Sequence, residues 1–220
     1  MSSSPPPALH FPLTPLEKKA RNHGLLLSVG FLIFVPLGVL VARYARTFTN
    51  KWWFGHWIIN FIISSPLIFA GWALGHQATN MSGLGHFNDT HKKVGLTLLV
   101  LYCFQLVLGI FIHFIRTPAL FIMHRSPQNY FHAILGFAIL ALAAYNIHYG
   151  LYTEWMFVTG NLHPVPMSAK DAWLALMIIF WALYGIGLLL LPRQWKQERG
   201  QLQGRREKED VASSGASAGP

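Results

Sequence analysis

The chain has 220 residues, of which 53% are hydrophobic and only 11% are charged. A typical soluble domain is about 25% charged, so this composition argues against a soluble globular protein. The formal net charge is +9, but the basic residues flank long apolar runs, which is typical of a membrane protein, so we expect no nucleic-acid partner. The only cysteine is Cys103, which excludes an intrachain disulfide and a cysteine-rich metal or iron–sulfur site.

Five apolar runs predict five membrane-spanning helices. Each run is comparable in length to the ~20 residues that an α-helix needs to cross the hydrocarbon core, where every backbone polar group must be paired. The runs cover residues 25–42, 52–74, 94–115, 131–149 and 172–191. We therefore predict an all-α integral membrane protein. Residues 1–14 and the basic segment 192–220 are predicted to be disordered, and residues 15–191 form the membrane domain.

Several helix ends can be predicted from capping patterns. Residues 14–17, Thr-Pro-Leu-Glu, form a capping box with proline at the first helical position. Residues 168–171, Ser-Ala-Lys-Asp, predict a similar cap for the fifth span, and Ser126 with Pro127 predicts a start for the fourth. Pro192 is expected to end the fifth helix.

The basic residues predict how the bundle crosses the membrane. We call the face where the first span begins side A and the opposite face side B. Side A holds six lysines and arginines and side B holds eleven, which predicts an outside or lumenal N-terminus and a cytoplasmic C-terminus. Two glycosylation sequons, beginning at Asn80 and Asn88, fall in a side-A loop and agree with this orientation. The pattern does not select a particular membrane.

Four histidines lie near the starts of four successive spans: His23, His56, His91 and His132. Antiparallel spans alternate in direction, so the starts of the first and third spans meet at side A and those of the second and fourth at side B. This arrangement gives one histidine pair per face, which is the ligand set for two bis-histidine haem b irons. We predict a four-helix haem-binding core within the five helices, with irons roughly 20 Å apart along the membrane normal by helix rise.

Residues beside the histidines suggest further contacts. Gly95 and Gly136 follow His91 and His132 by four residues and lie one turn away on the same helix face. They are candidate cofactor-binding positions that leave room for a porphyrin, and the alternative is ordinary packing of small residues between helices. Asn60, one turn after the histidine of the second span, is a candidate polar neighbour of that imidazole.

Cations at side B are candidate contacts for haem propionates or for a small anionic electron donor, although they can also serve only as the topology signal. They are Arg43, Arg46, Lys51 and Arg125. The other histidines do not form a competing ligand set. We interpret His76 and His86 as residues of a side-A loop or its edge, and His113 and His148 as polar interface residues.

The stretches around the four histidines resemble the cytochrome b561 superfamily, most closely the b561 module of DOMON-linked proteins. They run from residue 23 to about residue 150 and include His-Gly at 23–24, Pro-Leu-Gly at 36–38, Ala-Arg-Tyr at 42–44, Trp-Phe at 53–54, Gly-Trp-Ala at 71–73 with Gly75, and Gln-Asn-Tyr-Phe-His at 128–132. The resemblance implies two b haems, with His23 paired with His91 and His56 with His132. It also implies electron transfer from a cytosolic donor such as ascorbate to an outer acceptor such as ferric iron or monodehydroascorbate.

The sequence shows no DOMON domain before the first span, so we expect the acceptor to lie outside this chain. The leading hypothesis is a transmembrane electron-transfer cytochrome, a candidate oxidoreductase of the ferric or monodehydroascorbate reductase type. Its expected partners are membrane lipid, a small anionic reductant, and a ferric chelate or redox protein; a homodimer is left open.

Two alternatives remain at this point. One is a haem-binding membrane subunit that passes electrons to or from a partner redox enzyme. The other is a metal transporter that uses the histidines as zinc or copper ligands. Transporter sites are expected near the membrane midplane, whereas the four histidines lie towards the two faces.

Overall fold

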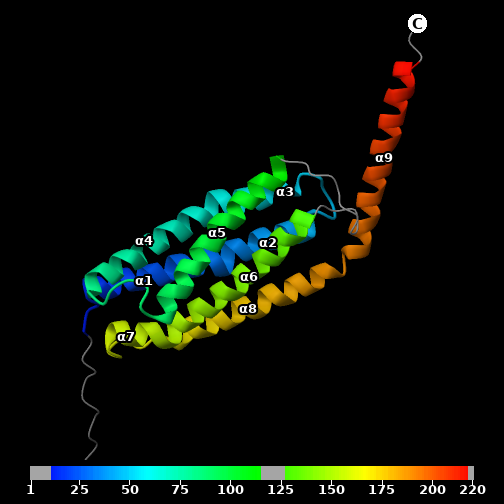
Figure 1. Cartoon of the computed structure of the whole chain (residues 1–220). Helices are drawn as coiled ribbons and strands as arrows, with labels where there is room; N and C mark the ends of the chain where they lie inside the picture. Colours follow the sequence, from blue (N-terminus) through cyan, green and yellow to red (C-terminus); the bar gives the residue numbers. More distant parts are fainter. Residues whose placement is uncertain (1–10, 115–126, 218–220) are drawn as a thin grey trace, which may run out of the picture.

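The computed structural model describes residues 11–114 and 127–217, which are helical with short connections (Figure 1). Within these residues five helices are long and apolar enough to cross a membrane: Pro15–Ala45, Trp52–Ser82, Thr90–Phe114, Pro127–Thr159 and Met167–Leu188. The five predicted spans are therefore confirmed. The first two have 31 residues each. At 1.5 Å per residue they are about 45 Å long, so their ends extend beyond a hydrocarbon core of about 30 Å.

The spans are divided into the following elements. The first consists of α1 (Pro15–Ser28), the π-helical segment η1 (Val29–Phe34) and α2 (Val35–Ala45), and the second of α3 (Trp52–Trp57), η2 (Ile58–Ser64) and α4 (Ser65–Ser82). The third is α5 (Thr90–Phe114). The fourth comprises α6 (Pro127–Tyr149), η3 (Gly150–Glu154) and α7 (Trp155–Thr159), and the fifth is α8 (Met167–Leu188), which is followed by α9 (Leu191–Ser217).

Two prolines explain the π-helical segments in the first two spans. η1 and η2 each end just before a proline, Pro36 and Pro66. Proline lacks an N–H, and its ring crowds the carbonyl four residues earlier, so the preceding turn widens. In η2 the Asn60 carbonyl accepts hydrogen bonds from Ser65 Oγ at 2.9 Å and from Tyr102 Oη at 3.0 Å. These side chains therefore add hydrogen bonds to a backbone carbonyl within the widened segment.

The first four spans form the core bundle, with α1 packed along α4 and α5 along α6 (Figure 1). Phe31, Ile68, Tyr102 and Ile139 meet at its centre and are each at most 2% exposed. The fifth span lies against the outside of this core, where Tyr44 Oη donates to a carbonyl of α8 at 2.6 Å. Many large apolar side chains remain exposed on the outer surface of the bundle, as expected for helices that face lipid.

The capping predictions have mixed outcomes. The capping box is confirmed, since the Glu17 N–H donates to Thr14 Oγ1 at 3.2 Å and the Thr14 N–H to Glu17 Oε2 at 2.6 Å. The predicted cap at Ser168 is wrong, because α8 begins one residue earlier, at Met167, after Pro166. Pro166 has extended geometry (φ −57°, ψ 141°), so it places the next residue ready for the helix without a side-chain cap.

The fifth span ends where it was expected to end, and the segment after it is helical. α8 ends at Leu188, ahead of Pro192 as expected. Leu191–Ser217 then forms α9, which leads away from the bundle at side B (Figure 1), where the sequence suggested a disordered tail. The segment is rich in Gln, Glu, Lys and Arg, which favour helix, and Pro192 lies in its first turn, where proline is tolerated. Ser126 lies outside the described residues.

Candidate functional site: two facing histidine pairs

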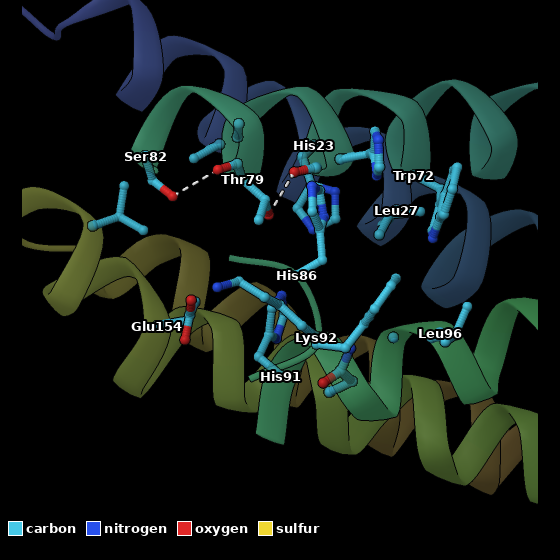
Figure 2. Close-up of a pocket in the computed structure, with 18 of the residues that line it drawn as sticks. His23, Leu27, Trp72, Thr79, Ser82, His86, His91, Lys92, Leu96 and Glu154 are labelled. Atoms are coloured by element: carbon cyan, nitrogen blue, oxygen red, sulfur yellow. Dashed lines mark hydrogen bonds between the residues drawn. The ribbon is translucent and has the colours of Figure 1, made fainter. Parts of the chain in front are cut away.

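At side A, His23 of α1 faces His91 of α5 across a cavity (Figure 2). Their ring centroids are 6.0 Å apart and the ring planes are inclined at 81°. His23 Nδ1 lies 2.8 Å from the carbonyl oxygen of Gly71, to which it can only donate. This hydrogen bond assigns the ring proton to Nδ1 and leaves the Nε2 lone pair available for a metal.

At side B, His56 of α3 faces His132 of α6 in the same way. The ring centroids are 6.3 Å apart and the planes are inclined at 72°. His56 Nδ1 donates to the Gly38 carbonyl at 2.8 Å, so Nε2 is again the available nitrogen. Asn60 lies beside this ring, as expected, but its Nδ2 donates to the backbone carbonyl of His56 at 2.8 Å, and the ring proton goes to Gly38.

The spacing within both pairs fits two axial imidazoles on one haem iron. An imidazole nitrogen binds a first-row metal at about 2 Å and lies roughly 1 Å from its ring centroid, so two opposed axial rings have centroids about 6 Å apart. The distances of 6.0 and 6.3 Å agree with this value. The structure thus brings together the two pairs that the sequence indicated, at opposite ends of one bundle.

Three glycines that sequence reasoning did not place in the site let a helix backbone pass close to these rings. A Cβ on Gly75 would lie 2.5 Å from His23 Nδ1, which is closer than real Cβ contacts come. A Cβ on Gly150 would lie 3.3 Å from Cε1 of His91, and one on Gly109 would lie 3.3 Å from Cε1 of His132.

The two glycines that were singled out from the sequence lie against amide side chains. Gly95 lines the side-A cavity, and a Cβ there would be 3.4 Å from Asn146 Nδ2. A Cβ on Gly136 would be 3.1 Å from Gln105 Nε2. The space beside each of these glycines is therefore bordered by an amide from the facing helix. Room for a porphyrin at these positions stays a prediction.

The side-A cavity has a volume of about 410 Å³, and its mouth carries polar side chains from three spans (Figure 2). His76 stacks between Trp72 and His86, with centroid distances of 5.5 and 4.4 Å. Lys92 and Glu154 also line the cavity. From the sequence, His76 and His86 were expected in a side-A loop or at its edge. Their place beside the histidine pair follows only from the fold, which brings the end of α4 and the next loop to this cavity.

Arg46 is the side-B cation that acts on the histidine pair. Its guanidinium lies 3.9 Å from the centroid of the Trp52 ring and close enough to influence both His56 and His132 electrostatically. Of the predicted cations that the structure describes, it is therefore the best placed to meet an anionic group at this end of the bundle.

The other predicted cations have different surroundings. Arg43 Nη2 donates to Gln194 Oε1 at 2.6 Å and so ties α2 to α9. Lys51 is exposed, immediately before α3. Arg125 lies outside the described residues.

Asp89 caps the start of α5, two residues before His91, and was not found from the sequence. Its Oδ1 accepts from the Lys92 N–H at 2.8 Å, and its Oδ2 lies 2.7 Å from Lys92 Nζ. Burial raises the pKa of the Asp89 carboxyl, but the hydrogen bonds and charge of Lys92 outweigh burial and leave this pKa below its usual value. A lowered folded-state pKa means that the carboxylate stabilises the fold above its unfolded pKa of about 4, and that this stability is lost as the pH falls through the lower folded value.

We therefore expect Asp89→Ala to lower stability by about 1 kcal/mol at pH 7 and by less at pH 3, because part of the stabilisation from the carboxylate is lost once the pH falls below the unfolded pKa of about 4. Thermal unfolding followed by circular dichroism at the two pH values measures this. Asp89→Asn keeps an oxygen acceptor and should show a smaller loss at pH 7. An equal loss for Asp89→Ala at both pH values would contradict the assigned role of the charge.

The chain matches a known protein family over the region that contains this geometry. The family model for eukaryotic cytochrome b561 matches residues 22–158, which is more than half of the chain and includes both histidine pairs. The chain belongs to the cytochrome b561 family. The resemblance inferred from the sequence is thereby confirmed. Cytochromes b561 bind haem b, and membership implies electron transfer across a membrane through haem.

Three relatives of this cytochrome b561 come from Arabidopsis thaliana. Two are cytochrome b561 and DOMON domain-containing proteins, 31% identical over 60% of this chain and 30% identical over 74% of it. The matched regions are 31% and 37% of those proteins, so the chain spans about a third of their length. The third, a cytochrome b561 domain-containing protein, is 25% identical over 75% of this chain and 63% of its own. No solved structure matches the chain.

Proposed function

We propose that this cytochrome b561 carries two haem b groups and conducts electrons across a membrane, with His23 and His91 binding the iron at side A and His56 and His132 the iron at side B. The observation that carries the proposal is the presence of two facing imidazole pairs, with centroids 6.0 and 6.3 Å apart, at opposite ends of one bundle. When bound, each haem supplies a one-electron ferric–ferrous couple.

The helices hold the two sites apart, and buried side chains fill the interval between them. His23 and Gly38, which contact the two different sites, lie on the same span and are 15 residues apart, so the sites are separated by about 22 Å of helix rise. Phe31 and Tyr102 pack edge to face in the interval, with centroids 5.5 Å apart. We infer that electrons cross the bundle by passing from one site to the other through this buried aromatic packing.

The direction of transfer follows from the proposed orientation. With side B in the cytosol, a small anionic reductant of the ascorbate type approaches the end that carries Arg46. Electrons then leave at side A, where an outer acceptor would approach the polar side chains that line the cavity, among them His76, His86 and Lys92. A ferric chelate or an ascorbate radical is the proposed acceptor, which makes the protein a transmembrane oxidoreductase.

A protein acceptor is the second candidate. The names of two relatives add a DOMON domain to the b561 domain, which supports a protein module as the outer partner. In that case the chain acts as a haem-carrying membrane subunit and has no small-molecule acceptor of its own.

Transport can be tested in sealed proteoliposomes that contain ascorbate and haem-loaded protein. We expect a membrane-impermeant ferric chelate outside to be reduced at a rate that depends on trapped ascorbate, and His23→Ala to abolish this reduction. Haems that are reduced by ascorbate but pass no electrons to the chelate would favour the protein acceptor. Haems that stay oxidised would contradict an ascorbate-type donor.

A further inference from the structure

The imidazoles of the third and fourth spans lack the hydrogen bond that their partners make. His23 and His56 each donate Nδ1–H to a backbone carbonyl. By contrast, Nδ1 of His91 and Nδ1 of His132 are buried and find no hydrogen-bond partner within the described residues. Imidazoles that bind a metal normally donate the other ring nitrogen to an acceptor, which fixes both tautomer and orientation.

A buried amide with an unused oxygen accompanies each of these two rings. Asn146 of α6 is 5% exposed, and its Oδ1 has no hydrogen-bond partner in the described part of the chain. It lines the side-A cavity together with His91, and both its side chain and its backbone lie near enough to that ring to influence it as hydrogen-bond acceptors, although no hydrogen bond with full geometry is formed. Gln105 of α5 donates from Nε2 to the backbone carbonyl of His132 at 2.8 Å, while its Oε1 is likewise buried without a partner among these residues.

The same arrangement of a histidine, an amide and two glycines occurs twice, in opposite directions, along the antiparallel helices α5 and α6. In each, a histidine is followed four residues later by a glycine, and the facing helix presents an amide that is also followed four residues later by a glycine. The two sets are His91 and Gly95 facing Asn146 and Gly150, and His132 and Gly136 facing Gln105 and Gly109.

The contacts within the two sets correspond closely. The glycine after each amide lies against the ring, and its Cβ would be 3.3 Å from Cε1 of His91 in one set and 3.3 Å from Cε1 of His132 in the other. The glycine after each histidine lies against the amide, with Cβ distances of 3.4 Å to Asn146 and 3.1 Å to Gln105. Because the amide occurs at the same place beside the histidine in both sites, we treat it as a part of each site.

We propose that Asn146 and Gln105 are positioning residues whose amide oxygens accept the Nδ1–H of His91 and of His132, respectively, when the rings bind iron. This inference rests on the haem ligation proposed above. An acceptor on Nδ1–H holds the ring in one orientation and increases the electron density on Nε2. A more electron-rich axial nitrogen stabilises ferric over ferrous iron, so each amide lowers the reduction potential of its own haem.

The test uses the haem-loaded full chain and measures the two midpoint potentials by spectroelectrochemical titration, together with the low-spin ferric EPR signals. Asn146→Leu removes the acceptor and keeps the same branched arrangement of four side-chain heavy atoms. We expect it to raise the potential of one haem and to shift the EPR signal of that haem alone, and Gln105→Leu to do the same to the other haem. Asn146→Asp keeps an oxygen at the same position and should give a potential at or below that of the native protein.

The matched control removes a different buried polar group near side A. Thr159 is 3% exposed, and its hydroxyl donates to the Trp155 carbonyl at 2.8 Å. Thr159→Val should leave both potentials unchanged.

The outcomes separate this inference from the proposed function. Two bound haems with native potentials and EPR signals in both leucine variants would overturn the positioning role and leave the function intact. A native protein that binds no haem would overturn the function and this inference with it. If Asn146→Leu does not bind haem, the Asn146→Asp variant provides the test. A native or lowered haem potential in that variant supports the positioning role, and a raised potential overturns it.

Discussion

Replacing His132 by alanine is expected to remove one of the two haems and to spare the other. His132 pairs with His56, whereas the other pair stands about 22 Å of helix rise away along the bundle, so loss of one ligand leaves the second site complete. The haem-to-protein ratio, measured on the purified variant, should fall from two to one, and one set of bands should disappear from the reduced spectrum.

His113→Ala provides the matched control for this prediction. His113 also lies at side B, but its ring packs against Trp53, with centroids 4.3 Å apart and planes inclined at 33°, and it is outside both pairs. The control should keep both haems. Two haems retained in His132→Ala would contradict the ligand assignment at side B.

Gly75→Ala is expected to abolish haem binding at side A although it adds only one carbon. The new Cβ would lie 2.5 Å from Nδ1 and 2.7 Å from Cε1 of His23. That ring is held by its hydrogen bond to the Gly71 carbonyl, so it cannot move aside without losing its alignment with His91. Overpacking of this kind also costs about 1–3 kcal/mol of stability. Haem stoichiometry and the thermal unfolding temperature measure the two effects.

Gly24→Ala is the control for steric conflict, because it adds the same methyl group directly after His23 with no atom within 4 Å of the new carbon. We expect it to bind two haems and to unfold at or slightly above the native temperature, because alanine favours helix over glycine. If Gly75→Ala behaved like Gly24→Ala, the close approach of α4 to the His23 ring would have no part in the site.

The spans and the histidine pairs could be predicted because each depends on a local signal and a simple rule. Apolar length sets the spans, and alternation of direction then decides that His23 meets His91 and that His56 meets His132. The Thr14 capping box is local in the same way.

The surroundings of the histidines could not be predicted, because they come from residues far away in the sequence. Gly150 lies 59 positions after the His91 ring that it borders. Asn146 belongs to a different span from His91. In the sequence it is only one polar residue within an apolar run. Only the register between α5 and α6 shows that it lies opposite His91.

The measurement that tests the central claim most directly is the visible absorption spectrum of the detergent-purified protein, first oxidised and then reduced with ascorbate, together with the haem-to-protein ratio. If each histidine pair binds one haem iron and the donor is of the ascorbate type, the protein should contain two b haems per chain that are at least partly reduced by ascorbate. Protein that is folded but free of haem would contradict the account, and the paired histidines would then need another explanation, with zinc or copper binding as the next to examine.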